Sequence, residues 1–176
     1  AWQVEKALGI SASKGLTPFV CLQPMYNLVK RQAEVEILPM AQAEKLGVMT
    51  YSPLAGGLLT GKYSGGQKPE QGRLLTNKIY ETRYAEPWMH EVARKFVQFA
   101  REQGYDPASL AVAWVKSHPA VTSAIIGARG VEQLKASLDS IKINMTPELR
   151  AAISSLSPEP PPATDRTEER TPFTLD

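Results

Sequence analysis

The sequence has one cysteine, Cys21, among 176 residues. A single cysteine excludes a disulfide framework within the chain and most cysteine metal sites, and it fits a reducing compartment such as the cytoplasm. No run of residues approaches the 18 or more apolar positions of a membrane span, so we expect no transmembrane segment. Apolar residues make up 43% and charged residues 22%, as in an ordinary globular protein.

Neither sign of charge is in large excess, since 20 basic and 18 acidic residues give a formal net charge of +2. The last twenty residues, 157–176, carry five acids and two arginines, which leaves 18 basic and 13 acidic residues in 1–156. This excess is too small for a duplex nucleic-acid binder, which gathers lysine and arginine on one face. It still leaves room for a local site for a small anion.

Histidine is the third rare residue type, present only as His90 and His118. Both lie on expected helices without a partner at ligand spacing, so we interpret them as surface or hydrogen-bonded side chains. Cys21 lies in an apolar segment and is interpreted as a small core residue. We therefore expect no metal site and no catalytic serine–histidine–aspartate arrangement.

Short apolar segments alternate with helical patterns along the chain. The runs at 18–22, 48–51 and 121–126 predict strands, and the continuous apolar run at 18–22 is typical of a strand buried on both faces. Helices are expected at 1–8, over 32–46 with either a kink at Pro39 or a start at about Met40, from 87, from 107, over 131–141 and from 147 onward. Leu134, Leu138 and Ile141 are predicted to face inward.

Capping residues mark several helix ends. Pro87, Asp106 with Pro107, and Thr146 with Pro147 are typical helix starts, and Gly47 is suited to follow the end of the 40–46 helix. The stretch 60–86 has no clean period. Connections of that length are usually functional.

The alternation of strands and helices predicts an α/β fold with a parallel sheet. Parallel strands must be covered on both faces, and three strands with five or six helices make a poor closed structure, so the pattern predicts part of a larger α/β fold. We expect 1–156 to form one structural unit and 157–176, with five of the fourteen prolines, to be a separate charged tail. The uncapped helix at the start is either a trimmed terminus that frays or the remainder of a helix that begins in missing sequence.

Gly56, Gly61 and Lys62 match most of the phosphate-binding loop of nucleoside triphosphatases. Tyr63 stands where that loop needs a serine or threonine for Mg²⁺. The segment 64–69 is also too rich in glycine and proline to open the helix that would hold phosphate. A triphosphatase is thus the weaker alternative.

Polar side chains follow the predicted strands. Gln23 and Tyr51 end two of them, and in parallel α/β folds ligands bind at the carboxyl ends of strands. Tyrosine offers a flat face for stacking, whereas glutamine offers a donor and an acceptor. Lys62, Arg73 and Arg129 are expected on loops after strands, and Arg129 precedes a helix start, where anions bind.

Three segments together resemble the aldo-keto reductase family. Residues 48–63 look like the seventh barrel strand and its loop, 19–27 like the sixth strand, and 124–134 like the eighth strand with the phosphate-binding helix. The resemblance is to the carboxyl-terminal half of the fold, in a branch similar to bacterial reductases related to the β subunits of potassium channels. It implies that 1–156 supplies the C-terminal half, about three strands with their helices, of a (β/α)₈ TIM barrel that binds NADPH.

The resemblance also implies roles for individual residues. Gln23 matches the residue that holds the nicotinamide carboxamide, and Tyr51 matches the aromatic that stacks on the nicotinamide. The pyrophosphate clasp matches Ser52, Pro53, Leu54, Ala55 and Gly56. The belt over the cofactor matches Thr60, Lys62 and Arg73. The adenosine end matches Gly127, Arg129, Gln133 and Ser137, with Arg129 on the 2′-phosphate, although Ala136 and Ser137 depart from the usual adenine contacts.

The family's catalytic tetrad comes from the first four strands, which are absent from this sequence, so no residue here is assigned a catalytic role. The resemblance implies that the complete barrel reduces an aldehyde or ketone with NADPH, near Met25, Tyr26 and Trp88, while this chain alone is inactive. The missing N-terminal half would be its partner. The alternative is a cofactor-binding regulatory or structural module without turnover.

Overall fold

Strands and helices alternate in the computed structural model, which describes residues 1–63 and 72–164. Strands β1 (Cys21–Leu22), β2 (Gly47–Thr50) and β3 (Ser123–Ala124) form a parallel sheet in the order β1-β2-β3. The predicted α/β class is confirmed, and the sheet is open, since β1 and β3 each have a partner on one side only among the described residues.

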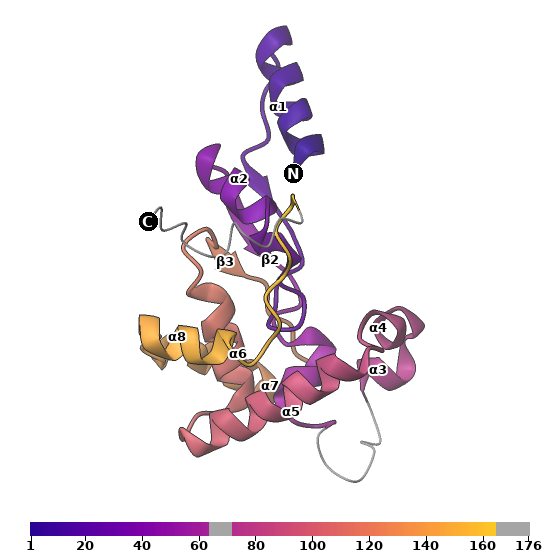
Figure 1. Ribbon diagram of the computed structural model, residues 1–176, viewed down its shortest axis with the longest axis vertical. Coiled ribbons are helices and arrows are strands. Elements are labelled where there is room, and N and C mark those ends of the chain that lie inside the picture. Colours follow the sequence, from indigo (N-terminus) through magenta and orange to yellow (C-terminus); the bar gives the residue numbers. More distant parts are fainter. Residues whose placement is uncertain (64–71, 165–176) are drawn as a thin grey trace, which may run out of the picture.

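Helices fill the connections between the strands and extend beyond them (Figure 1). The α-helices are α1 (Trp2–Lys14), α2 (Ile37–Ala43), α3 (Arg73–Thr76), α4 (Lys78–Arg83), α5 (Pro87–Glu102), α6 (Pro107–Lys116), α7 (Val131–Leu138) and α8 (Pro147–Ser154). The 3₁₀ helices are η1 (Gln32–Glu34), η2 (Ala55–Thr60) and η3 (Asp139–Lys142). Among the described residues, no helix has the length and apolar character needed to cross a membrane.

The predicted caps of the later helices are confirmed. Pro87 is the first residue of α5. The Asp106 carboxylate accepts a hydrogen bond of 2.8 Å from the Ser109 amide at the start of α6, and the Thr146 hydroxyl accepts from Leu149 at the start of α8. These bonds satisfy amides that the first helical turn leaves unpaired.

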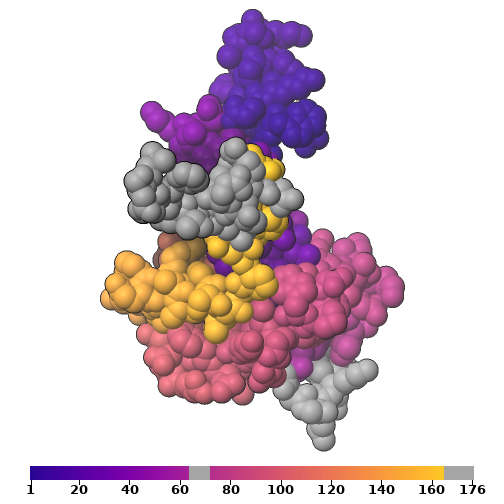
Figure 2. Space-filling model, in the orientation of Figure 1, coloured from indigo at the N-terminus to yellow at the C-terminus, as the bar shows by residue number. Residues whose placement is uncertain are grey.

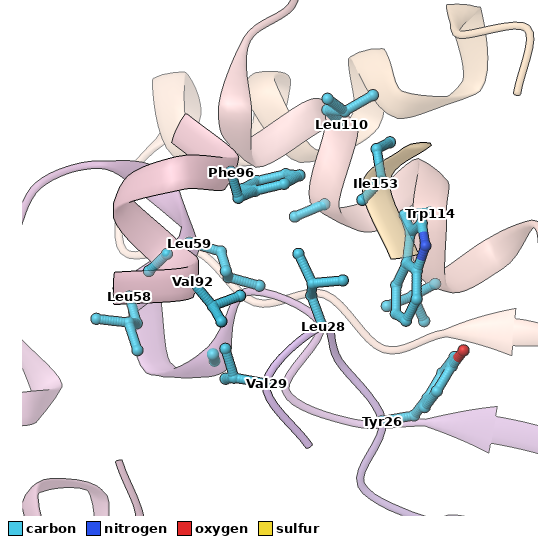
Figure 3. Close-up of a cluster of buried hydrophobic side chains, with 14 of the residues drawn as sticks. Tyr26, Leu28, Val29, Leu58, Leu59, Val92, Phe96, Leu110, Trp114 and Ile153 are labelled. Atoms are coloured by element: carbon cyan, nitrogen blue, oxygen red, sulfur yellow. The ribbon is translucent and has the colours of Figure 1, made fainter. Parts of the chain in front are cut away.

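The hydrophobic core lies where α5 and α6 pack against the segments that leave β1 and β2 (Figure 3). Phe96 of α5 and Trp114 of α6 are almost fully buried, as are Leu28 after β1 and Leu58 in η2. The core thus fixes the loops that follow the strands, which is where ligands bind in parallel α/β folds.

The predicted burial of the first strand is wrong. β1 contains only Cys21 and Leu22, and the residues before it are exposed: Phe19 by 62% and Val20 by 72%. Cys21 is also exposed and is not a core residue. The reason is that β1 is an edge strand here, and α1 projects away from the rest of the molecule (Figures 1 and 2).

The inward orientation predicted for the apolar residues of 131–141 is also wrong. Leu134, Leu138 and Ile141 are exposed by 40%, 49% and 69%. The helix ends at Leu138, and η3 continues the chain. Leu138 and Ile141 line a hollow beside Ser123 and Ala124 of β3, which is the other edge of the sheet.

Two local expectations need correction. Gly47 does not follow the end of α2, because Lys45 adopts the left-handed conformation (φ 56°) and Gly47 already begins β2. The stretch 60–86 contains α3 and α4, so Arg73 is in a helix and not in a loop. The Asn77 side chain accepts hydrogen bonds from two amides at the start of α4, a cap that the missing period obscured. The segment 64–69 of the triphosphatase comparison lies outside the described residues.

Candidate functional site

The carboxyl ends of the three strands lie side by side. Beyond β1 and β2 the pairing continues, because the Tyr51 amide donates to the Pro24 carbonyl at 3.0 Å and Tyr51 pairs in parallel with Met25. On the other side, the Ile125 amide donates to the Thr50 carbonyl at 2.8 Å. The segments that follow β1, β2 and β3 therefore leave the same edge of the sheet, with Tyr51 in the middle.

A left-handed turn follows Tyr51. Ser52 and Ala55 have φ values of 59° and 50°, and Gly56 and Gly57 have 67° and 94°. Positive φ is free for glycine but costs a residue with a Cβ on the order of 1–2 kcal/mol. Two such non-glycine residues within four positions mark a backbone whose shape the surrounding structure enforces, a feature that clusters at functional sites.

The two glycines of this turn lie against side chains from outside it. A Cβ at Gly56 would be 2.7 Å from Cδ1 of Tyr80, and a Cβ at Gly57 would be 2.8 Å from Nζ of Lys62. At Gly56 a side chain would collide with the Tyr80 ring, whereas at Gly57 the flexible end of Lys62 could move aside. Lys62, which the sequence analysis selected, is thereby placed beside the turn, and so is Tyr80, which it missed.

Two arginine side chains pack against the ring of Tyr80. The guanidinium of Arg73 lies 5.4 Å and that of Arg83 lies 5.1 Å from the centre of the Tyr80 ring, and Arg73 also donates to the Tyr80 hydroxyl. The ion pairs found among residues 1–63 and 72–164 do not involve Lys62, Arg73 or Arg83. Positive charge thus gathers around the glycine turn without a described carboxylate to neutralise it.

Asn27 and Tyr84 join the turn to the neighbouring loop. The buried amide of Asn27 donates to the Ser52 carbonyl at 3.0 Å and to the Tyr84 hydroxyl at 3.2 Å, and its oxygen accepts from the Val29 amide. Tyr84 in turn donates to the Met25 sulfur. Burial raises the pKa of Tyr84, so its hydroxyl stays protonated at neutral pH. Sequence spacing gave no signal for either residue, since they are 57 positions apart.

The third strand exit has a different character. Gly127, Arg129 and Gln133 are all exposed, and the Arg129 amide donates to the Gln133 side chain at 3.1 Å. Arg129 stands two residues before the first residue of α7. The unpaired amides of a helix start and a guanidinium together favour an anion at this position.

Tyr26 does not line a substrate pocket, contrary to the sequence expectation. Its side chain is fully buried and donates a 2.5 Å hydrogen bond to Glu34 while accepting one from Arg150. Burial raises the pKa of Tyr26, and the Glu34 carboxylate raises it further. Burial alone would raise the pKa of Glu34, but hydrogen bonds from Arg31 bring that pKa below its usual value.

Trp114 completes this buried network. Its ring is stacked on Tyr26 with 5.1 Å between centroids, and the Arg150 guanidinium lies 4.8 Å from its centre (Figure 3 shows Tyr26 beside Trp114). His118 contacts the edge of Tyr26, and burial together with Arg150 lowers the pKa of His118. The network ties α8 to the loop after β1 and belongs to the core.

Ser137 is buried, which the sequence analysis did not predict, and its ligand role remains a prediction. Its side chain is 2% exposed, and its hydroxyl is directed into the interior without a hydrogen-bond partner. The preceding carbonyl, that of Ala136, accepts a bond from Ser109 of α6, which holds this side of α7 inward. Ser137 lies among the residues around the hollow beside β3 and not on the exposed face of α7.

The remaining candidates lie at or near the carboxyl ends of the strands. Tyr51 is partly exposed at the central strand exit, Lys62 lies beside Gly57 in the turn that follows, and Arg129 lies between β3 and α7. Gln23 is exposed after β1, and Trp88 is 38% exposed in the first turn of α5. Their ligand roles remain predictions, as do those of Pro53, Leu54 and Thr60.

Comparison with known proteins places the chain. Residues 1–158 match the model of the aldo/keto reductase family. The protein Tas of Escherichia coli (strain K12) is 32% identical over 158 residues, which cover 89% of this chain and 45% of Tas. The uncharacterized oxidoreductase YrpG of Bacillus subtilis (strain 168) is 33% identical over 159 residues, covering 90% of this chain and 47% of YrpG.

A probable voltage-gated potassium channel subunit beta of Oryza sativa subsp. japonica is 35% identical over 173 residues, or 94% of this chain and 52% of that protein. The chain thus spans about half the length of the curated relatives it matches, and it matches their C-terminal portion. The match over residues 1–158 shows that the chain belongs to the aldo/keto reductase family.

Proposed function

We propose that this chain supplies the cofactor-binding, C-terminal half of a (β/α)₈ barrel that reduces an aldehyde or ketone to an alcohol with NADPH. The observation that carries the proposal is the convergence of three parallel strand exits on Tyr51, with Lys62 and Arg73 beside the glycine turn and Arg129 at the third exit. Family membership supports an oxidoreductase and argues against a nucleoside triphosphatase.

The two uncovered edges of the sheet support a half barrel. Exposed apolar residues lie before β1, at Phe19 and Val20, and along α7 and η3. A hollow of about 170 Å³ beside β3 is lined in part by Ile126, Leu138 and Ile141. In a closed barrel, a further strand and helix would pair with β3 and fill this hollow. The partner of this chain is then the first half of the same barrel.

In the proposed mechanism the site residues of this chain bind and orient the cofactor. Tyr51 stacks on the nicotinamide and Gln23 holds its carboxamide, which together select the face that points to the substrate. The backbone from Ser52 to Gly56 and the cations Lys62 and Arg73 hold the diphosphate. When bound, NADPH supplies the hydride.

The proton for the product alcohol comes from a donor outside this chain. None of the residues described here is assigned that role, since Tyr26 is buried with a raised pKa and Tyr51 is assigned to the ring. Met25 and Trp88 would contact the carbonyl substrate. The 176-residue chain alone is accordingly expected to show neither turnover nor tight NADPH binding, and the proposed location of the complete protein is the cytoplasm.

Substitution of Arg129 tests the cofactor assignment in the complete barrel. Arg129→Ala removes a charge-assisted contact to the 2′-phosphate, so NADPH affinity should fall about 10- to 100-fold while NADH affinity stays nearly constant. Cofactor fluorescence titration measures both. Equal losses for the two cofactors would remove the 2′-phosphate assignment, and Arg94→Ala on the exposed side of α5 is the matched surface control.

A second candidate function is a regulatory or structural module that binds the cofactor without turnover. Similarity to a probable potassium channel subunit favours keeping it. The intact mass of the protein that carries this chain, followed by its upstream sequence, separates the two. A tyrosine and a lysine at the ends of the second and third strands would support the enzyme, whereas their absence would support the module.

A further inference from the structure

Two backbone positions in the turn after Tyr51 need an explanation. Ser52 and Ala55 are left-handed although neither is glycine. The carbonyl of Ser52 accepts two hydrogen bonds, one from the Ala55 amide at 3.0 Å and one from the Asn27 side chain at 3.0 Å. The first bond is local to the turn, whereas the second comes from a different strand connection and fixes the turn from outside.

Both polar atoms of the Asn27 side chain form hydrogen bonds. Asn27 is 0% exposed, its nitrogen donates to Ser52 and to Tyr84, and its oxygen accepts from Val29 in its own loop. Buried amides with all their principal partners satisfied hold a single orientation, because any rotation leaves polar groups unpaired. Asn27 therefore couples the β1 exit, the β2 exit and the end of α4.

We infer that Asn27 is a positioning residue that holds the 52–57 turn in its left-handed conformation before any ligand binds. The functional value of this positioning by Asn27 rests on the proposed function, in which the turn supplies the backbone for the diphosphate and directly follows Tyr51. A turn held in place in advance loses less conformational entropy when a ligand binds, which raises affinity without an added contact.

The test uses hydrogen exchange of the turn amides in the 176-residue chain. Asn27→Asp keeps the acceptor for Val29 but places a carboxylate oxygen against the Ser52 carbonyl. Exchange at Ala55 and Gly57 should then accelerate about tenfold or more, with little change at Phe96 in the core. Uniform acceleration that includes Phe96, or no acceleration at all, would overturn the inference.

Ser52→Gly provides the rescue. Glycine adopts a positive φ without strain, so combining Ser52→Gly with Asn27→Asp should recover most of the lost protection. A double variant that exchanges as fast as Asn27→Asp alone would contradict a role in holding the backbone. If Asn27→Asp does not fold, Tyr84→Phe removes one partner only and should accelerate the same amides by a smaller factor, whereas the control Tyr105→Phe should not.

The same variants in the complete barrel separate this inference from the proposed function. Faster NADPH dissociation in Asn27→Asp, restored by Ser52→Gly, supports both. Failure of the unmodified barrel to bind NADPH refutes the proposed function, while the exchange result still decides the role of Asn27.

Discussion

Single residues around the turn after Tyr51 combine conformational and steric demands, and Gly56 shows both. Its φ of 67° disfavours any Cβ, and an added Cβ would also be 3.0 Å from Leu74 and 2.7 Å from Tyr80. Gly104 has a similar φ of 75° with no atom within 4 Å of the added Cβ. Comparing alanine variants at the two positions therefore separates the free-energy cost of a positive φ from the cost of the collision with Tyr80 and Leu74.

Gly56→Ala should lower the free energy of unfolding by about 2–3 kcal/mol, and Gly104→Ala by about 1 kcal/mol. Denaturant unfolding of both variants measures the difference. Equal losses would mean that Tyr80 and Leu74 move aside without cost, and that the contact with Tyr80 does not fix the turn.

His118 makes stability depend on pH. Burial, and then Arg150, lower its pKa below the ordinary value of 6.5, while Glu34 acts in the opposite direction and Arg31 adds to the lowering. The folded chain therefore holds fewer protons than the unfolded chain, and stability that is present above pH 6.5 is lost as pH falls toward the folded-state pKa.

His118→Asn tests this dependence. The His118 ring accepts a hydrogen bond from the Ala120 amide at 3.1 Å, and an asparagine oxygen can take its place. Between about pH 7 and pH 5, the unfolding free energy of the unmodified chain should fall more steeply than that of the variant. Glu34, whose pKa is lowered, contributes below this window. Parallel pH profiles would contradict the assignment.

At the scale of elements, Arg150 is one of the side chains that hold α8, beside the buried Ile153 and the hydrogen bond from Trp114 to Ser154. Arg150 donates to the Trp114 carbonyl at 2.5 Å, to the Ser117 hydroxyl at 2.6 Å and to Tyr26 at 3.0 Å. An eight-residue helix is too short to be stable alone in water, so these contacts decide whether it stays folded on α6.

Arg150→Ala should cost about 2–3 kcal/mol and accelerate amide exchange in α8 first. Arg94→Ala is the matched control, because Arg94 forms an exposed ion pair with Glu91 on α5 and such pairs contribute little. If both variants unfold at the same denaturant concentration, the network around Trp114 does not anchor α8.

At the scale of the molecule, the open β3 edge of the sheet predicts where a second part of the barrel would bind. Leu138 beside β3 is 49% exposed and Leu75 on α3 is 48% exposed, so Asp at either position should leave the chain's own stability nearly unchanged. If the first half of a barrel covers the β3 edge, only Leu138→Asp should weaken its association with this chain. Size-exclusion chromatography of the two halves measures this, and equal association of both variants would exclude the edge as the interface.

Particular residues show how far sequence patterns reach. The caps at Asp106 and Thr146 act within three residues, so their chemistry is local and was predicted. The inward orientation predicted for Leu134 and the burial predicted for Cys21 are wrong, because hydrophobic pattern alone does not show whether another element covers a side chain at the edge of the sheet. The burial of Tyr26 and Ser137 was not predicted, because their strand-end and helix positions did not reveal which side the core occupies.

The sequence by itself determined the order of strands and helices, the parallel sheet and the positions of Gln23, Tyr51 and Arg129 at strand exits, because hydrophobic period and turn chemistry are properties of neighbouring residues. Only the tertiary structure decided that Asn27 meets Ser52 and that Tyr80 covers Gly56. Those contacts join segments 24 or more positions apart, and no local pattern encodes which distant side chain completes a buried hydrogen bond.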